Sequence, residues 1–378
     1  MMEKINLCLV IGPVKSGTTM MISLLDGHPK FAAFPLEVKF LTHWFEKLSK
    51  TTQSYQSLNQ FFISQSKIKL MNPDGIHDGD IMNSGRIDFS GFDFNRFKER
   101  MLELEARRHP WSGTQDALFD IYLQDIHQVL KQTAGSPTFQ WIVSKEGNHG
   151  VQHIGTIDQK FPGTRYIVVV RDPRDVYASI KAIADKKIRG VAAPSFKQIT
   201  SPARFILDNE GKNFTAFERC LSAARDKFSS YIFVKYEDIV RDPKTELSKI
   251  ARFLNVPFDP CLLRPTNLDK PWGGNSSSLK SFSGLTASRS KKWDAELSFR
   301  EIRVIEYFLS RYLESGHYEK VSGRAPRFQI ALDTAVAEVL ALIRYRTAST
   351  EWFKEIIKSC LYSVRIVALL RKQNNSGT

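Results

Sequence analysis

Short apolar runs rich in β-branched residues alternate along this chain with segments whose apolar residues recur at helical spacing. The apolar runs have the length of buried strands and occupy residues 5–11, 141–144, 165–170 and 231–234. The helical segments occupy residues 18–25, 173–184, 214–228 and 243–254. Strands that alternate with helices predict an α/β fold in which helices flank a central parallel β-sheet.

Two regions depart from this alternation. Residues from about 45 to 135 are polar, rich in Asn, Gln, Asp and aromatic residues, and carry mixed helical signals. They indicate a helical and loop insertion that shapes the acceptor side of a site. Beyond Arg327, apolar residues recur at helical spacing in two stretches. We therefore expect one α/β domain over residues 1–327 and an amphipathic helical extension over residues 328–378.

The C-terminal extension is open to three interpretations. Its two helices pack on the core as a hairpin, form a homodimer contact, or touch a membrane surface weakly. The last two interpretations arise because basic residues accompany the apolar faces. These basic residues are Arg344, Arg346, Lys354, Lys358, Arg365 and Arg371.

The composition narrows the classes of partner. The 378 residues carry a formal net charge of +14, which favours anionic partners such as nucleic acid, acidic lipid, polyanionic sugar or a charged nucleotide. The basic residues are spread along the chain without a Lys/Arg tract or a nucleic-acid-binding motif, so we expect no nucleic-acid partner.

The cysteines and the apolar runs bear on the cellular setting. Cys8, Cys220, Cys261 and Cys360 lie far apart without metal-ligand spacing, which fits a reducing compartment. The N-terminal sequence lacks the layout of a signal peptide, and no apolar run reaches the roughly 18 residues of a spanning helix. We expect a cytoplasmic protein.

Two loops carry the candidate chemistry. GPVKSGTT at residues 12–19 follows the first apolar run, and RDPRDVYAS at residues 171–179 follows the third. A strand, a loop and a helix in this order aim backbone N–H groups and a helix N-terminus at an anion. Two such loops, the second with Arg171 and Ser179 eight residues apart, suggest a nucleotide phosphorylated at both its 5′ and 3′ ends.

The first loop departs from that of ATP-hydrolysing proteins. Gly12 and Gly17 keep the spacing of G-x-x-x-x-G-K-[ST], but Thr18 stands where the Lys is expected. The only Lys of the loop is Lys15. This disfavours a kinase-like ATP phosphotransferase, which stays an alternative beside a non-catalytic nucleotide-binding protein.

Together the two loops resemble those of sulfotransferases that use 3′-phosphoadenosine 5′-phosphosulfate (PAPS), in particular bacterial and Golgi-type carbohydrate sulfotransferases with a P-loop fold. The resemblance implies that the first loop holds the 5′-phosphosulfate through Lys15, Ser16, Gly17, Thr18 and Thr19. It assigns to Lys15 the additional role of stabilising the leaving phosphate.

The same resemblance places the rest of the nucleotide. It implies that Arg171 and Ser179 bind the 3′-phosphate, although the motif also suits a surface Arg beside a capping Asp172. Tyr236 corresponds to an adenine neighbour, or else packs locally at a strand end. Arg289 lies in a segment that resembles the family's lid over the nucleotide.

Two residues compete for the role of general base. The segment 28–40 resembles the one that carries a catalytic Glu in polysaccharide and tyrosylprotein sulfotransferases, which implicates Glu37 unless it only pairs with Lys39. His149, shortly after Lys145, resembles the catalytic His of cytosolic sulfotransferases, although Glu146 replaces the usual Thr or Ser. The expected acceptor is a hydroxyl or amine of a carbohydrate, lipid or small molecule, and no metal is expected because Lys and Arg supply the charge.

Overall fold

The computed structural model describes two compact units. The described residues are 6–52, 54–72, 89–135, 138–148, 150–188, 200–223, 230–274, 285, 290–344 and 350–375. Unit 1 comprises residues 1–12, 17–170 and 224–287, and unit 2 comprises residues 13–16, 171–223 and 288–378. The domain boundary predicted at residue 327 divides the sequence differently from these two units, and it stays a prediction.

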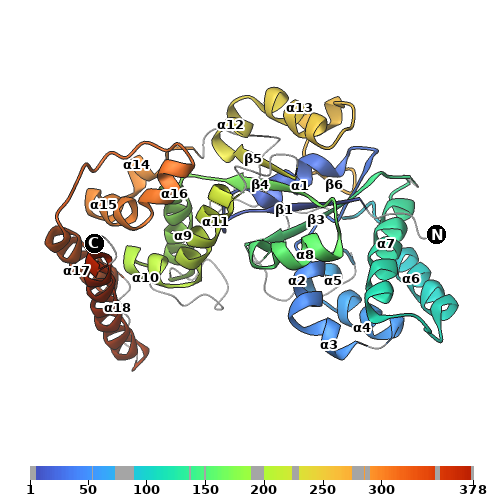
Figure 1. Cartoon of the computed structure of the whole chain (residues 1–378), viewed down its shortest axis with the longest axis horizontal. Helices are drawn as coiled ribbons and strands as arrows, with labels where there is room; N and C mark the ends of the chain where they lie inside the picture. Colours follow the sequence, from blue (N-terminus) through green and yellow to red (C-terminus); the bar gives the residue numbers. More distant parts are fainter. Residues whose placement is uncertain are drawn as a thin grey trace. The chain divides into compact units, whose positions relative to one another are not determined.

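A five-stranded parallel β-sheet forms the centre of unit 1 (Figure 1). Its strands are β1 (Leu7–Ile11), β2 (Phe31–Ala33), β3 (Trp141–Gly147), β4 (Arg165–Val170) and β5 (Tyr231–Lys235). The order β2-β3-β1-β4-β5 places the first strand at the centre, and every pairing is parallel. The predicted α/β class is therefore confirmed, and the carboxyl ends of the strands lie along one edge, where such sheets bind ligands.

Helices α1 (Thr18–Asp26), α12 (Tyr236–Arg241) and α13 (Pro243–Phe253) share an apolar core with this sheet. Their aliphatic side chains face strand residues such as Val10 and Val143, which are fully buried. Pro243 begins α13 beside a capping Asp242, whose side chain accepts a hydrogen bond from the Thr245 N–H. The shorter elements of unit 1 are η2 (Gly150–His153), α8 (Ile154–Lys160), η4 (Pro260–Leu263), β6 (Thr266–Asn267) and β7 (Lys270–Pro271).

The region from about 45 to 135 is mostly helical where the structure describes it. Its elements and those leading into it are α2 (Phe40–His43), η1 (Trp44–Leu48), α3 (Ser49–Thr51), α4 (Tyr55–Ile63), α5 (Ser66–Lys69), α6 (Phe94–Arg108) and α7 (Gln115–Thr133). Its aromatic residues pack on one another, as Trp44 and Phe119 do with ring centroids 4.4 Å apart. Residues 73–88 of this region lie outside the described residues.

Unit 2 is helical in its described part. It contains α9 (Pro173–Ile188), α10 (Pro202–Leu207), α11 (Asn209–Ala223), α14 (Trp293–Glu296), α15 (Phe299–Phe308), α16 (Ser310–Ser315), α17 (Arg327–Arg344) and α18 (Thr350–Asn375). The last two are the predicted C-terminal helices, and Ile330, Ile366 and Leu370 anchor them to Ala203 of α10. A membrane-spanning helix, judged by length and hydropathy together, is not found among the described residues.

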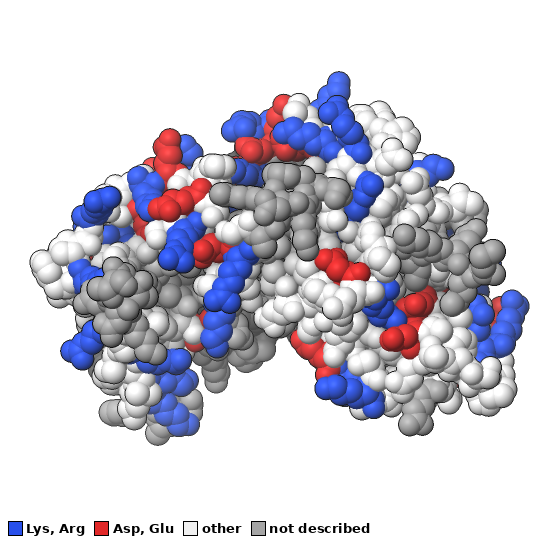
Figure 2. All heavy atoms as spheres, viewed as in Figure 1, with Lys and Arg blue, Asp and Glu red and all other residues white. Residues whose placement is uncertain are grey.

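The charge of the described surface is mixed. On the face shown in Figure 2, Lys and Arg are interleaved with Asp and Glu in both units. The net positive charge is therefore spread out on this face, as the even distribution of basic residues along the sequence indicated.

A buried carboxyl group in unit 1 leads to a pH-dependent prediction. Asp26 is 7% exposed, and burial raises its pKa to about 6. The hydrogen bonds donated by Thr266 Oγ1 and the Asp269 N–H lower the pKa, but by less than burial raises it. Because the folded-state pKa lies above the unfolded one, the folded state is stabilised below about pH 4 and loses this stabilisation as the pH rises through 6.

We expect Asp26→Asn to remove this loss, because an amide oxygen accepts the same two hydrogen bonds without a charge. Above pH 7 the variant should exceed the wild type in free energy of unfolding by up to about 3 kcal/mol, from roughly two pKa units at 1.36 kcal/mol each. Urea denaturation at pH 5 and pH 8 measures the difference. Parallel pH profiles for the two proteins would contradict the assignment.

Candidate active site

The first of the two predicted phosphate-binding loops connects β1 to α1. Lys15 and Gly17 have φ angles of +60° and +103°, which turn the backbone sharply before the helix. A Cβ at Gly17 would lie 2.6 Å from Cδ2 of Tyr236, so the Tyr236 ring packs directly against the loop. Within the described part of the chain, the buried Ser16 Oγ has no hydrogen-bond partner. A buried hydroxyl in this position is suited to an anionic ligand.

Lys145 connects this loop to Glu37. Lys145 lies in β3 opposite Val10 of β1, which brings the end of β3 beside the start of the loop. Its Nζ donates to Thr19 Oγ1 at 2.8 Å and to Glu37 Oε2 at 2.5 Å. The second Glu37 oxygen, Oε1, lies 3.4 Å from the Nζ of Lys39. One carboxylate therefore holds two cations beside the predicted phosphate-binding loop.

These cations control the protonation of Glu37. Burial acts to raise its pKa, but the charge and hydrogen bonds of Lys145 and Lys39 outweigh burial and lower the pKa to about 2. A carboxylate with so low a pKa is ionised at every physiological pH but accepts a proton weakly. Because Lys145 exerts the largest attraction on this carboxylate, displacement of its ammonium group would raise the pKa of Glu37.

Glu146, the departure from the family pattern, fixes the position of the segment that carries Glu37. Its buried carboxylate accepts hydrogen bonds from the N–H groups of Leu41 and Thr42, at 3.2 and 3.0 Å, where α2 begins. It also accepts from the hydroxyls of Thr42 and Ser144. Four donors offset part of the cost of burying this carboxyl group, but burial still raises its pKa above the ordinary value. A Thr or Ser at this position could not reach all of them.

Gly147 lies against Glu37 and suggests a test of that contact. Its φ is +58°, and a Cβ there would lie 2.7 Å from Glu37 Oε1. We expect Gly147→Ala to displace the carboxylate and lower turnover, and to cost about 1–2 kcal/mol of stability through its left-handed backbone. Gly135→Ala is the matched control, because Gly135 has φ +82° with nothing within 4 Å of the added Cβ. Equal turnover in the two variants, measured with stability by urea denaturation, would refute the contact's role.

The second loop holds the first through Arg171. Arg171 follows β4 and is 7% exposed, so it is not a surface residue. Its Nη1 donates to the Lys15 carbonyl oxygen at 2.9 Å, and its own carbonyl accepts from Tyr312 Oη at 3.4 Å. Asp172 does act as a cap, since its Oδ1 accepts from the Arg174 N–H. Ser179 is half-buried in α9, two turns further on.

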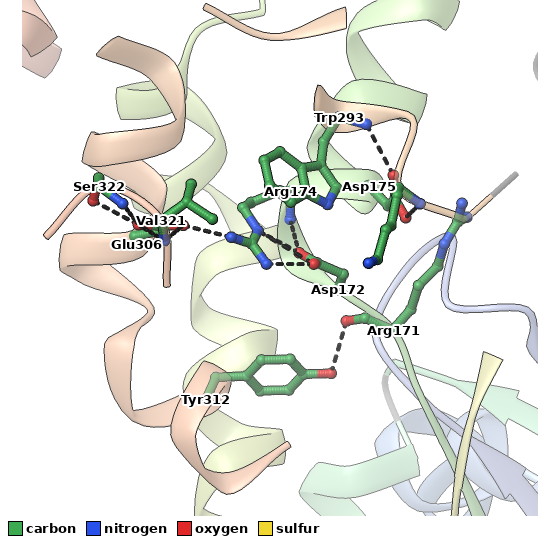
Figure 3. Close-up of polar contacts among 10 residues, drawn as sticks. Arg171, Asp172, Arg174, Asp175, Trp293, Glu306, Tyr312, Val321 and Ser322 are labelled. Atoms are coloured by element: carbon green, nitrogen blue, oxygen red, sulfur yellow. Dashed lines mark hydrogen bonds and ion pairs between the residues drawn. The ribbon is translucent and has the colours of Figure 1, made fainter. Parts of the chain in front are cut away.

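Arg174 is the centre of a buried ionic cluster that sequence analysis did not identify. It contacts Asp172 Oδ2 at 2.7 Å and Glu306 Oε1 at 2.5 Å, and its guanidinium lies 3.9 Å from the Trp293 ring centre. Glu306 also accepts from the N–H groups of Val321 and Ser322. Figure 3 shows this cluster next to Arg171, to its left in the view. The signal in the sequence was the run of opposite charges at residues 171–175, directly after a buried strand.

Asp175 fastens a second segment to the same loop. Its carboxylate accepts the N–H groups of Lys291 and Trp293 at 2.9 and 3.1 Å. The described part of the predicted lid, residues 290–293, is thereby attached to the start of α9. Arg289 and His149 lie outside the described residues. Among the described residues, no group of three or more His, Cys, Asp or Glu side chains could hold a metal ion.

Comparisons with solved structures give distant similarities. A sulfotransferase domain from the curacin biosynthetic pathway is 18% identical, with a TM-score of 0.49 over 84% of this chain and 99% of that one. A sulfotransferase domain from the Synechococcus PCC 7002 olefin synthase is 16% identical, with a TM-score of 0.46 over 84% and 98%. Retinol dehydratase in a complex with retinol and PAP is 15% identical, with a TM-score of 0.37 over 85% and 84%.

The family comparison is decisive. No functionally curated protein matches the chain. The model of the sulfotransferase family, in contrast, matches residues 8–260, which contain the sheet, both loops, Glu37 and Lys145. This match spans more than half of the sequence, and the protein therefore belongs to the sulfotransferase family.

Proposed function

We propose that this protein transfers a sulfuryl group from PAPS to a hydroxyl or amine of a carbohydrate, lipid or small-molecule acceptor. The observation that carries the proposal is the position of Lys145. Its ammonium group contacts Thr19 of the first loop and Glu37 at the same time. In a reaction that leaves extra negative charge on a phosphate and releases a proton, a cation can stabilise the charge and a neighbouring carboxylate can accept the proton.

The residues present suit a nucleotide with charge at both ends. Around the 5′-phosphosulfate, Lys15 supplies a cation, and Ser16, Gly17, Thr18 and Thr19 supply hydroxyl and amide donors. The buried Ser16 Oγ, which lacks a hydrogen-bond partner among the described residues, supports this assignment. For the 3′-phosphate we propose Arg171 and Ser179, because a guanidinium donates two parallel hydrogen bonds to a phosphate.

The remaining contacts concern the adenine. We propose Tyr236 as its neighbour, because the Tyr236 ring lies against Gly17 and so stands at the loop itself. We also propose that Arg289, in the segment that resembles the family's lid, contacts the nucleotide. This proposal is based on the sequence alone.

PAPS supplies the sulfuryl group and a leaving group, adenosine 3′,5′-bisphosphate. In the reaction the acceptor oxygen or nitrogen forms a bond to sulfur while the bond from sulfur to the 5′-phosphate oxygen breaks. Glu37 takes the proton of the acceptor, and Lys15 and Lys145 balance the negative charge gained by the 5′-phosphate. Movement of Lys145 toward that phosphate weakens its hold on Glu37, which raises the pKa of the carboxyl group when a base is needed.

His149 is the second candidate base, as the sequence indicates. We further propose that residues 1–327 form the catalytic domain and that the protein works in the cytoplasm. The wide spacing of Cys8, Cys220, Cys261 and Cys360 along the sequence, without a metal-ligand pattern, supports a reducing setting.

Calorimetry and label transfer test the proposal together. Adenosine 3′,5′-bisphosphate should bind more tightly than AMP or ATP, and Arg171→Ala should reduce its affinity about 10- to 100-fold, the loss of a charge-assisted contact. Arg241→Ala, an exposed Arg 75% accessible, is the matched control. Transfer of label from sulfur-35 PAPS to an acceptor panel should persist in a chelator. Equal affinity for the bisphosphate and AMP, or transfer of phosphate from ATP, would refute the proposal.

A further inference from the structure

A single helical stretch begins three residues after Glu37, the candidate base. It consists of α2, η1 and α3 and runs without a break from Phe40 to Thr51. Figure 1 shows it below the sheet in the view, beside α4. Trp44 and Leu48 are buried on its inner side. The middle of the stretch, η1, is π-helical, a geometry that is rare and is frequently found at functional sites.

Basic side chains follow the outer side of this stretch. Lys39 precedes the first turn, and His43, Lys47 and Lys50 lie four, eight and eleven residues further on. Residues three and four apart are neighbours on a helix surface, so these four side chains form a row, which we call the basic row. Lys47 and Lys50 are exposed. The basic row begins at the candidate base, because Lys39 Nζ lies 3.4 Å from Glu37 Oε1.

An aromatic ring of α4 lies against the middle of the basic row. The ring centres of His43 and Phe61 are 5.2 Å apart, and Lys47 Nζ lies 5.9 Å from the centre of the Phe61 ring. Both side chains therefore point to the same side of the helix, as the spacing of the basic row requires. Phe61 is half-buried, so part of its surface faces solvent.

The outer end of the basic row carries positive charge that no described acidic residue pairs with. Within the described part of the chain, neither Lys47 nor Lys50 forms an ion pair. The only acidic residue between positions 40 and 51 is Glu46, and its carboxylate pairs with His153 Nε2 at 3.3 Å. Residues 39–51 expose no large apolar side chain, so this surface does not suit a membrane. It suits an anionic ligand in water.

We propose that the basic row and Phe61 bind an acidic saccharide and direct its reacting hydroxyl to Glu37. Carboxylate or sulfate groups of the saccharide pair with Lys47 and Lys50, and the apolar face of a sugar ring packs on Phe61. The basic row is about 15 Å long at the rise of a helix, which gives room for an oligosaccharide. This proposal rests on the proposed function, because it takes Glu37 as the base, and it narrows the acceptor to one class.

Calorimetry of the full chain with two hexasaccharides tests the proposal. Unsulfated chondroitin hexasaccharide, which carries carboxylates, should bind about tenfold more tightly than neutral chitohexaose, because only chondroitin forms charge-assisted contacts with both lysines. Lys47→Gln and Lys50→Gln should each weaken binding of chondroitin about three- to fivefold, the share of one exposed ion pair. Phe61→Leu should weaken binding of both hexasaccharides about fivefold, since the ring is lost. Adenosine 3′,5′-bisphosphate is present in a parallel titration, to keep the saccharide out of the nucleotide site.

The matched control is Lys244→Gln. Lys244 is an exposed lysine of α13 that also forms no ion pair within the described part of the chain, and its variant should bind chondroitin as the wild type does. Thermal melts followed by circular dichroism establish that each variant folds. Equal affinity for the two hexasaccharides, or equal affinity in Lys47→Gln and Lys244→Gln, would overturn the proposal. A single-stranded DNA oligomer that binds more tightly than chondroitin, and that loses affinity in Lys47→Gln, would assign the basic row to nucleic acid instead.

Transfer of label from sulfur-35 PAPS distinguishes this proposal from the proposed function. Lys47→Gln should raise KM for chondroitin about three- to fivefold and leave kcat unchanged, because Lys47 binds the acceptor away from the reacting atoms. Binding that depends on the basic row, without any transfer of label, would uphold the saccharide site and refute the reaction. Transfer to chitohexaose with the same KM as to chondroitin would uphold the reaction and overturn the acidic acceptor.

Discussion

Glu37→Gln is expected to lower kcat by about 10²- to 10⁴-fold, the usual contribution of a general base. The amide keeps the size of the side chain but cannot take a proton from the acceptor. Affinity for adenosine 3′,5′-bisphosphate should be equal to that of the wild type or higher, because Lys145 no longer has a carboxylate to hold it. Single-turnover label transfer and calorimetry measure the two quantities separately.

Two further variants distinguish a role of Glu37 as general base from a role as the partner in a structural ion pair. Glu46→Gln removes a glutamate that pairs with His153 in the same unit, and its turnover should equal that of the wild type. Lys145→Met removes the main attraction that lowers the pKa of Glu37 while burial remains, so that pKa should rise well above 2. A carbon-13 titration of the Glu37 carboxyl follows the rise. Normal turnover in Glu37→Gln would leave His149 as the base.

Arg174→Met is expected to lower the free energy of unfolding by about 3–5 kcal/mol, the usual result of breaking a buried ion pair. The substitution leaves Asp172 and Glu306 as buried anions, 5% and 1% exposed, without their shared cation. Met retains much of the packing on Trp293, so the loss reports the charge rather than a cavity. Urea denaturation at neutral pH measures it.

The control for this prediction lies on the surface. Arg241→Met removes an ion pair with Asp238 from an Arg that is 75% exposed, and should change stability by less than about 1 kcal/mol. Adding Glu306→Gln to Arg174→Met should recover part of the loss, because one of the uncompensated anions becomes neutral. A loss in Arg174→Met no larger than that in Arg241→Met would contradict the role of the cluster.

The parallel sheet was predictable because its strands carry local signals. Four strands were found from β-branched runs, and residues 165–170 match β4 at both ends. Strand β2 was missed, since three residues, Phe31–Ala33, are too few to show a period. Their extended form depends on pairing with Trp141, Ile142 and Val143, which no local pattern encodes.

The contacts of the candidate site were harder to predict than its residues. Glu37 and Lys145 were both noticed, but they lie 108 residues apart, and their meeting depends on the pairing of β2, which precedes Glu37, with β3. Arg174 lies in the run of opposite charges at residues 171–175, but nothing in the sequence marks Glu306, 132 residues away, as its partner. Nothing in the sequence marks Ser16 as buried, because that depends on how the loop folds over it.

The two contacts of Lys145 have a kinetic consequence. A single ammonium group that is held by Glu37 in the free protein can turn to the donor's phosphate only by loosening that hold. An acceptor that arrives before the donor then meets a carboxylate too weakly basic to activate it. If the proposed reaction holds, the nucleotide must therefore bind before the acceptor for turnover to occur. For the same reason, Glu37 does not activate a water molecule that enters the site before the nucleotide does.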